Sequence, residues 1–205
     1  MSKDSASSHN SKSQSAQNRQ KNRRKNTGQK KPKKITESYL HNAGLYYLER
    51  FATSSGNFRE VMMRKVKRSC MFHTEQDYDK CAQMVDALVE KFIRTELLND
   101  TAYTRNMVQS LRRKGKSAKS IQLYLRGKKL DSALIISALE ERDLETHETA
   151  SEAELEAAMK FARKKRIGPF RGDKEEDIKK ELGRLARAGF SYDTSRTVLN
   201  YDDQD

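Results

Sequence analysis

Apolar side chains recur every three or four residues along most of the chain after residue 34. This spacing places them on one face of an α-helix, and no stretch alternates apolar and polar residues for long enough to indicate a strand. Beyond residue 34 a single proline, Pro169, interrupts the pattern. The chain is therefore predicted to be all-α. The predicted helices cover residues 36–53, 56–69, 75–97, 100–114, 117–128, 131–142, 149–166, 174–188 and 191–200.

Short polar side chains mark the starts of several of these helices, and glycines mark breaks between them. A Ser or Asp before the first turn accepts a hydrogen bond from an unpaired helical N–H, and glycine turns the chain easily because it lacks a Cβ. The predicted caps are Ser55, Asp100, Ser117, Asp131, Asp173 and Ser191. The predicted breaks are Gly115, Gly172 and Gly189.

The apolar spacing repeats along the chain. The pair Ile121-x3-Leu125 recurs as Ile178-x3-Leu182 and as Phe58-x3-Met62, with offsets of 57 and 63 residues. The pattern Leu130-Asp131-x7-Leu139 recurs as Phe190-Ser191-x7-Leu199. We expect three tandem three-helix units, at residues 35–98, 99–146 and 147–205. Because a unit of about 55 residues buries little core alone, neighbouring units should pack into an elongated, slightly curved body.

The positive charge is unevenly placed. The 205 residues hold 42 Lys and Arg and 29 Asp and Glu, a net charge of +13. Residues 1–34 hold eleven basic side chains, one acid and almost nothing apolar, which predicts a disordered basic arm of net charge +10. Residues 131–205 are net acidic, at −5, whereas residues 101–130 hold nine cations and no acid.

The nine cations of residues 101–130 form the candidate binding surface, because a helical surface normally mixes charges of both signs. They are Arg105, Arg112, Arg113, Lys114, Lys116, Lys119, Arg126, Lys128 and Lys129. If Tyr103 and Leu111 face inward, helical geometry turns Arg105 and Arg112 toward solvent. We therefore expect Arg105→Glu with Arg112→Glu to preserve helicity and to weaken partner binding. The expected partner is anionic, either phosphates or carboxylates.

The same region resembles a known family. Leu97-Leu98-Asn99-Asp100-x2-Tyr103 is followed by Ser110-x-Arg112-Arg113-x-Gly115, by Ile121-x3-Leu125 and by Lys128-Lys129-Leu130-Asp131. With Arg187-Ala188-Gly189-Phe190-Ser191 near the C-terminus, these motifs resemble the RecX regulatory proteins of bacteria over about residues 36–200. The sequence departs from the family pattern at Glu96, where the family commonly has Gly, and at Thr104, where a small Ala is usual.

The resemblance implies function by binding. RecX-like proteins attach to the RecA recombinase filament on single-stranded DNA and restrain strand exchange and coprotease activity, with roles in DNA repair and the SOS response. The expected partners are thus RecA and its filament, with weak direct DNA binding in addition. Two alternatives stay open, a general nucleic-acid-binding helical protein and a helical adaptor for an acidic protein. The sequence leaves open whether the cations face filament acids, DNA phosphates or both.

The sequence offers little support for catalysis or for a cofactor. Neither a Walker-type loop nor G-x-G-x-x-G occurs, and no recognisable catalytic triad is visible. Cys70, His73 and Cys81 lack a fourth ligand for zinc. We therefore expect a non-enzymatic protein without metal or cofactor. No apolar run is long enough to span a membrane and the N-terminus is polar, which favours a cytoplasmic location. We also expect a monomer.

Overall fold

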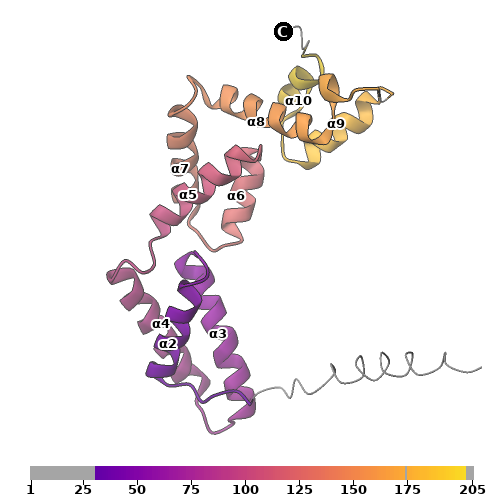
Figure 1. Cartoon of the computed structure of the whole chain (residues 1–205). Coiled ribbons are helices and arrows are strands. Elements are labelled where there is room, and N and C mark those ends of the chain that lie inside the picture. Colours follow the sequence, from indigo (N-terminus) through magenta and orange to yellow (C-terminus); the bar gives the residue numbers. More distant parts are fainter. Residues whose placement is uncertain (1–30, 174, 202–205) are drawn as a thin grey trace, which may run out of the picture. The chain divides into compact units, whose positions relative to one another are not determined.

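The computed structural model describes residues 31–173 and 175–201, so the predicted basic arm lies outside the described residues up to residue 30. The described residues form nine α-helices and no strand, which confirms the predicted all-α class (Figure 1). The helices are α2 (Glu37–Leu48), α3 (Ser55–Phe72), α4 (Tyr78–Arg94), α5 (Asp100–Arg113), α6 (Ala118–Arg126), α7 (Ser132–Leu144), α8 (Ala150–Lys165), α9 (Ile178–Arg187) and α10 (Tyr192–Leu199). A short 3-10 turn, η2 (Gly168–Phe170), precedes α9.

The helices group into three units, each around its own core (Figure 1). The core of unit 1 (α2–α4) holds ten buried hydrophobic residues, with Phe58 and Phe92 at its centre, their ring centroids 5.5 Å apart. Unit 2 (α5–α7) is centred on Ile121 and Leu125, and unit 3 (α8–α10) on small alanines of α8 together with Leu185. Burial of these apolar faces is the main stabilising term for helices this short.

The repeat continues into unit 3 in a different register from the predicted one. Phe58 and Ile121 are both fully buried and lie 63 residues apart, as predicted. Ile178, however, is 53% exposed, and the buried residues of α9 are Glu181 and Leu185. Unit 3 therefore follows unit 2 at an offset of 60 residues, and a buried glutamate stands where unit 2 has Ile121.

Glu181 is accommodated because its carboxylate is satisfied by hydrogen bonds. It accepts one from the Gly168 N–H at 3.1 Å and one from the Arg171 guanidinium at 3.1 Å. Such hydrogen bonds offset the loss of water that burial of a polar group entails. The apolar pattern was therefore a poor guide at this position.

Three of the predicted helix caps are confirmed, namely Ser117, Asp131 and Ser191. The other three were wrong. The true caps are Ser54, Asn99 and Asp177, because these side chains accept from the N–H groups of the first turn. The predicted breaks at Gly115, Gly172 and Gly189 all have positive φ angles, of 70°, 64° and 96°.

Within the described residues, no helix is both long enough and apolar enough to cross a lipid bilayer.

Candidate interaction surface

The nine cations of residues 101–130 do not form one surface. Arg112 is 7% exposed and lies in the protein interior. Arg105 and Lys129 are exposed but ion-paired, to Glu141 at 2.9 Å and to Glu60 at 3.3 Å. The remaining six have no ion-pair partner among the described residues. We call these six the basic ridge: Arg113, Lys114, Lys116, Lys119, Arg126 and Lys128.

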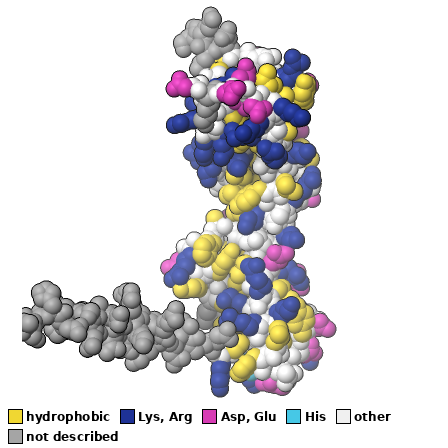
Figure 2. Space-filling view, turned by 90° about the vertical axis from the view of Figure 1, so that its right-hand side faces the viewer, with side chains coloured by type: hydrophobic (Ala, Val, Ile, Leu, Met, Phe, Trp, Pro, Cys, Tyr) yellow, Lys and Arg dark blue, Asp and Glu magenta, His cyan; other side chains and the backbone are white. Residues whose placement is uncertain are grey.

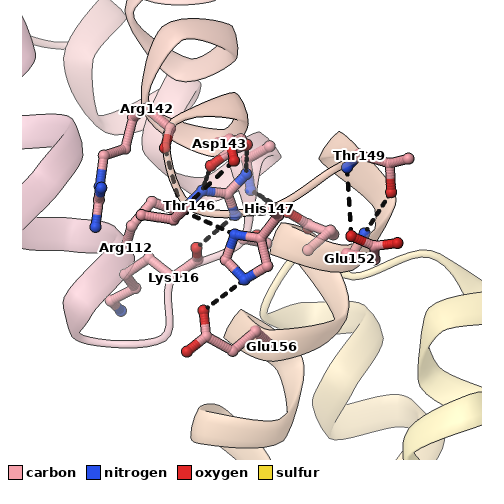
Figure 3. Close-up of polar contacts among 12 residues, drawn as sticks. Arg112, Lys116, Arg142, Asp143, Thr146, His147, Thr149, Glu152 and Glu156 are labelled. Atoms are coloured by element: carbon pink, nitrogen blue, oxygen red, sulfur yellow. Dashed lines mark hydrogen bonds and ion pairs between the residues drawn. The ribbon is translucent and has the colours of Figure 1, made fainter.

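Arg112 bridges two units through a buried charge network (Figure 3). Its guanidinium binds the Asp143 carboxylate through Nε at 2.9 Å and Nη2 at 2.5 Å. Nη1 donates to the Glu154 carboxylate at 2.6 Å and to the Lys116 carbonyl at 3.2 Å. Burial alone lowers the pKa of Arg112, but the hydrogen bonds to both carboxylates outweigh it and raise the pKa. Arg112 thus joins α5, α7 and α8.

The outward placement of Arg112 was wrong because α5 has a wider buried face than its apolar stripe indicates. Thr104, Val108 and Arg112, spaced four residues apart, are the buried residues of this helix. Tyr103 and Leu111 lie at the edge of the core and are half-buried. Arg112 therefore cannot contact a partner from its place in the fold, and Arg112→Glu would put a carboxylate against Asp143.

The ridge turns sharply at Gly115, between α5 and α6. With φ at 70°, Gly115 lets the Lys116 N–H reach back to the Leu111 carbonyl at 3.1 Å, a C-terminal capping arrangement that favours glycine. A Cβ at this glycine would lie 2.9 Å from the Lys160 Cβ of α8. Arg113, Lys114 and Lys116 are thus presented by a turn that rests directly on unit 3.

The start of α6 is fixed to unit 3 by two hydrogen bonds. The Ser117 hydroxyl caps α6 and donates to the Ala188 carbonyl at the end of α9, at 2.6 Å. The Ala118 N–H donates to the Glu154 carboxylate of α8 at 3.0 Å. Lys119 and Arg126, further along α6, are exposed on this firmly held helix.

Units 1 and 2 are joined by two hydrogen bonds of the same kind as those that join units 2 and 3. The Ser54 hydroxyl, which caps α3, donates to the Lys128 carbonyl after α6. The Ser55 N–H donates to the Asp100 carboxylate of α5 at 2.7 Å. Ser55 and Asp100, predicted as helix caps, therefore form a contact between units. The two junctions repeat one arrangement, in which a serine and a carboxylate join successive units.

Sequence reasoning missed a second group of cations, on unit 3. Ten exposed basic side chains lie there, among residues 160–196. They are Lys160, Arg163, Lys164, Lys165, Arg166, Lys179, Lys180, Arg184, Arg187 and Arg196. Figure 2 shows dark-blue side chains gathered in the upper part of the molecule, at the level of α8–α10. The run Arg163–Arg166 was a visible signal, but the net charge of −5 for residues 131–205 concealed it.

The net charge misled because several acids of unit 2 and unit 3 serve inside the protein. Asp143 and Glu181 are buried, and Glu154 is only 20% exposed. These carboxylates are ion-paired with Arg112 and Arg171 and accept hydrogen bonds from backbone N–H groups. The acids are therefore partly hidden, whereas the ten cations face solvent.

The described cysteine and histidine residues do not come together as a metal site. Among the described residues, no three His, Cys, Asp or Glu side chains are placed to hold a metal ion. Cys81 is buried, and burial together with a hydrogen bond to Cys70 raises the pKa of its thiol. A raised pKa keeps the thiol protonated, and the protonated form is a poor metal ligand.

Known proteins with similar sequences carry one name. No protein-family model matches the chain. The regulatory protein RecX of Myxococcus xanthus (strain DK1622) is 39% identical over 181 residues, which cover 87% of this chain and 93% of that protein. The regulatory protein RecX of Agrobacterium fabrum (strain C58) is 29% identical over 168 residues, covering 79% and 82% of the two chains.

Two solved structures share the fold. A regulatory protein RecX has a TM-score of 0.57 at 20% identity, covering 80% of this chain and 72% of that one. RecX from Lactobacillus salivarius has a TM-score of 0.56 at 23% identity, covering 80% and 94%. At these identities the structures support the helical fold alone.

Proposed function

Since the chain belongs to the RecX family of regulatory proteins, we propose that it binds the RecA recombinase filament on single-stranded DNA and restrains strand exchange and coprotease activity. The observation that carries the proposal is the 39% identity to a regulatory protein RecX across 87% of the chain. RecA as the target is what the resemblance of residues 97–131 to the family implies. The proposed action is by binding, without catalysis by this chain.

The geometry supports a binding role. The basic ridge presents six cations with no ion-pair partner among the described residues, and unpartnered cations are available to an anionic surface. The ridge runs from the end of α5 through the following turn and along α6 to Lys128, and hydrogen bonds join this segment to units 1 and 3. A docking surface held in this way loses little conformational entropy when it binds.

The test measures the effect of the purified full chain on RecA. We expect the protein to lower RecA-driven strand exchange and RecA ATP turnover on single-stranded DNA. A variant with Lys116→Gln and Lys119→Gln should be less effective, since both side chains belong to the ridge. The matched control is Lys67→Gln with Lys80→Gln, two exposed lysines of unit 1. No effect of the wild-type protein, even in excess over RecA, would contradict the proposal.

A second candidate is a general nucleic-acid-binding protein, favoured by the net charge of +10 on residues 1–34. In that case naked DNA should bind as tightly as the filament. Removing residues 1–30, which leaves the buried Ile35 in place, should then sharply reduce the salt dependence of binding. Tighter binding to filaments than to naked DNA would favour RecA regulation instead.

A further inference from the structure

The basic ridge continues across the junction onto unit 3. Gly115, in the turn between α5 and α6, packs against Lys160 and the backbone of Phe161 on α8. The exposed cations of that turn therefore lie beside the exposed Lys160, and Lys164 follows one helical turn later on the same face of α8. Cations from both units thus border the line of contact between units 2 and 3, which we call the seam.

A second contact extends the seam along α6. A Cβ at Gly189, in the turn between α9 and α10, would lie 2.5 Å from the Ser117 Oγ and 3.4 Å from the Lys119 Cβ. Lys119 of unit 2 therefore stands next to this turn of unit 3.

We call these six side chains the seam cations: Arg113, Lys114, Lys116, Lys119, Lys160 and Lys164. Five of them have no ion-pair partner within residues 31–173 and 175–201. Lys160 pairs with Glu156 at 2.6 Å, and this hydrogen bond lowers the pKa of Glu156. Glu156 also contacts the His147 ring at 3.0 Å (Figure 3), so its carboxylate already has two partners.

The composition of the seam indicates its partner. Five of the six seam cations are lysines. Lysine is depleted at protein–protein interfaces, where arginine and aromatic side chains are enriched, whereas nucleic-acid interfaces are strongly positive. Lysine binds a phosphate well as a compact point charge. We propose that the seam cations hold the phosphate backbone of single-stranded DNA.

A nearby aromatic side chain favours a single strand over a duplex. Tyr192 follows Gly189 by three residues and is 64% exposed, with the Arg196 guanidinium 5.9 Å from its ring centroid. Unstacked bases of a single strand can stack on such a ring, and bases within a duplex cannot. The arrangement thus offers both a phosphate surface and a stacking platform.

This inference rests on the proposed function, because it assigns the DNA of the RecA filament to the seam. Its test uses naked DNA, so that the inference can fail even if the protein regulates RecA. The full chain is compared with a variant carrying Arg113→Gln, Lys116→Gln, Lys119→Gln and Lys164→Gln. The control variant carries Lys67→Gln, Arg68→Gln, Lys80→Gln and Lys91→Gln, which change exposed side chains of unit 1. Circular dichroism establishes that all three proteins are folded.

Binding to a fluorescent oligo-dT is measured over a range of salt concentrations. Each phosphate contact with a single strand contributes about 0.7 to the slope of log K against log salt, so the seam variant should lose about 3 from the slope. Its affinity should fall by about tenfold or more, and the control should match wild type. Residues 1–34 contribute equally to all three proteins and cancel in the comparison.

A seam variant that keeps the slope and affinity of the control would overturn the inference. So would a seam variant that loses its effect on RecA but keeps its oligo-dT binding, because the seam would then contact RecA protein. If the wild-type chain has no effect on RecA but the seam variant shows a smaller salt slope for oligo-dT binding, the proposed function is contradicted and phosphate binding at the seam is supported. Tyr192→Ala should weaken oligo-dT binding more than duplex binding, and equal losses would exclude the single-strand assignment.

Discussion

The Ser117 hydroxyl donates a 2.6 Å hydrogen bond to the carbonyl oxygen of Ala188, which joins the start of α6 in unit 2 to the end of α9 in unit 3. Ser117 is fully buried, and its oxygen also accepts the Ser120 N–H at 3.1 Å. One hydroxyl thus serves both as a helix cap and as a contact between units.

Ser117→Ala should lower the free energy of unfolding by about 2 kcal/mol, the sum of a lost cap and a lost buried hydrogen bond. Urea unfolding followed by circular dichroism measures the loss. Ser191→Ala is the matched control, because Ser191 caps α10 and is exposed. The control should cost about 1 kcal/mol. Equal losses in the two variants would show that the bond to Ala188 does not stabilise the fold.

Arg112→Ala should destabilise the protein by about 3–5 kcal/mol, because it leaves the buried Asp143 carboxylate without a cation. Arg105→Ala should change stability by at most about 1 kcal/mol, because the Arg105–Glu141 pair is exposed. Thermal and urea unfolding report both. Arg112→Met combined with Asp143→Leu should recover most of the loss. A mild effect of Arg112→Ala would contradict the buried network.

Gly115→Ala should cost about 3 kcal/mol, because the new methyl group meets Lys160 and the α8 backbone at a positive φ. Gly172→Ala separates the two causes. Gly172 also has a positive φ, of 64°, but a Cβ there would meet nothing within 4 Å. Its replacement should therefore cost only about 1 kcal/mol, the price of backbone strain. Similar losses for both variants, by urea unfolding, would argue against close packing at the seam.

Glu96→Gly should stabilise the protein by about 0.5 kcal/mol. Glu96 has φ at 57°, a left-handed conformation that strains a residue with a Cβ, and glycine relieves this strain at some cost in unfolded-state entropy. Glu90→Gly, in the interior of α4, is the control and should destabilise by about 1 kcal/mol. A loss of stability in Glu96→Gly would refute the argument from strain.

Lowering the pH should weaken the ion pair between Arg59 of α3 and Asp86 of α4. The hydrogen bond from Arg59, 2.6 Å long, lowers the pKa of Asp86 below its ordinary value. A lowered pKa gives stability that is present above the unfolded-state pKa and is lost as pH falls through the folded-state pKa. Asp86→Asn should therefore be less stable than wild type at pH 7 by under about 1 kcal/mol, since the pair is exposed.

The difference in unfolding free energy between the two proteins should shrink as pH falls below about 4 and should vanish once the pH is below the folded-state pKa of Asp86. Chemical unfolding at a series of pH values measures this difference. A difference that stays constant down to pH 2 would show that the Asp86 charge is not its cause.

Local sequence signals predicted the helices well and the network poorly. The 3.6-residue period and the short polar caps depend on neighbours within one turn, so Ser117, Asp131 and Ser191 were recognisable. Arg112 was not, because its carboxylate partners lie 31 and 42 residues away along the chain. Which side of α5 is buried depends on how α7 and α8 pack, and that information is absent from the helix itself.

The sequence revealed only part of the exposed positive charge, because it does not show which acids are buried. Six of nine cations in residues 101–130 stay unpaired within the described chain, and their lack of neighbouring acids was visible in the sequence. The cations of unit 3 were hidden by a segment charge of −5, because a sum over residues cannot distinguish Glu181, which is buried, from an exposed acid. Exposure decides which charges a partner meets.

The network around Arg112 also sets the size of the cooperative folding unit. Glu154 binds the Arg112 guanidinium from unit 3 while Asp143 binds it from within unit 2. Melting of unit 3 alone would strip one carboxylate from a buried cation and uncover the Ser117 contact with Ala188 at the same moment. We therefore expect units 2 and 3 to unfold together, as one thermodynamic domain larger than the three-helix repeat, with native-state hydrogen exchange reporting a single opening event for both.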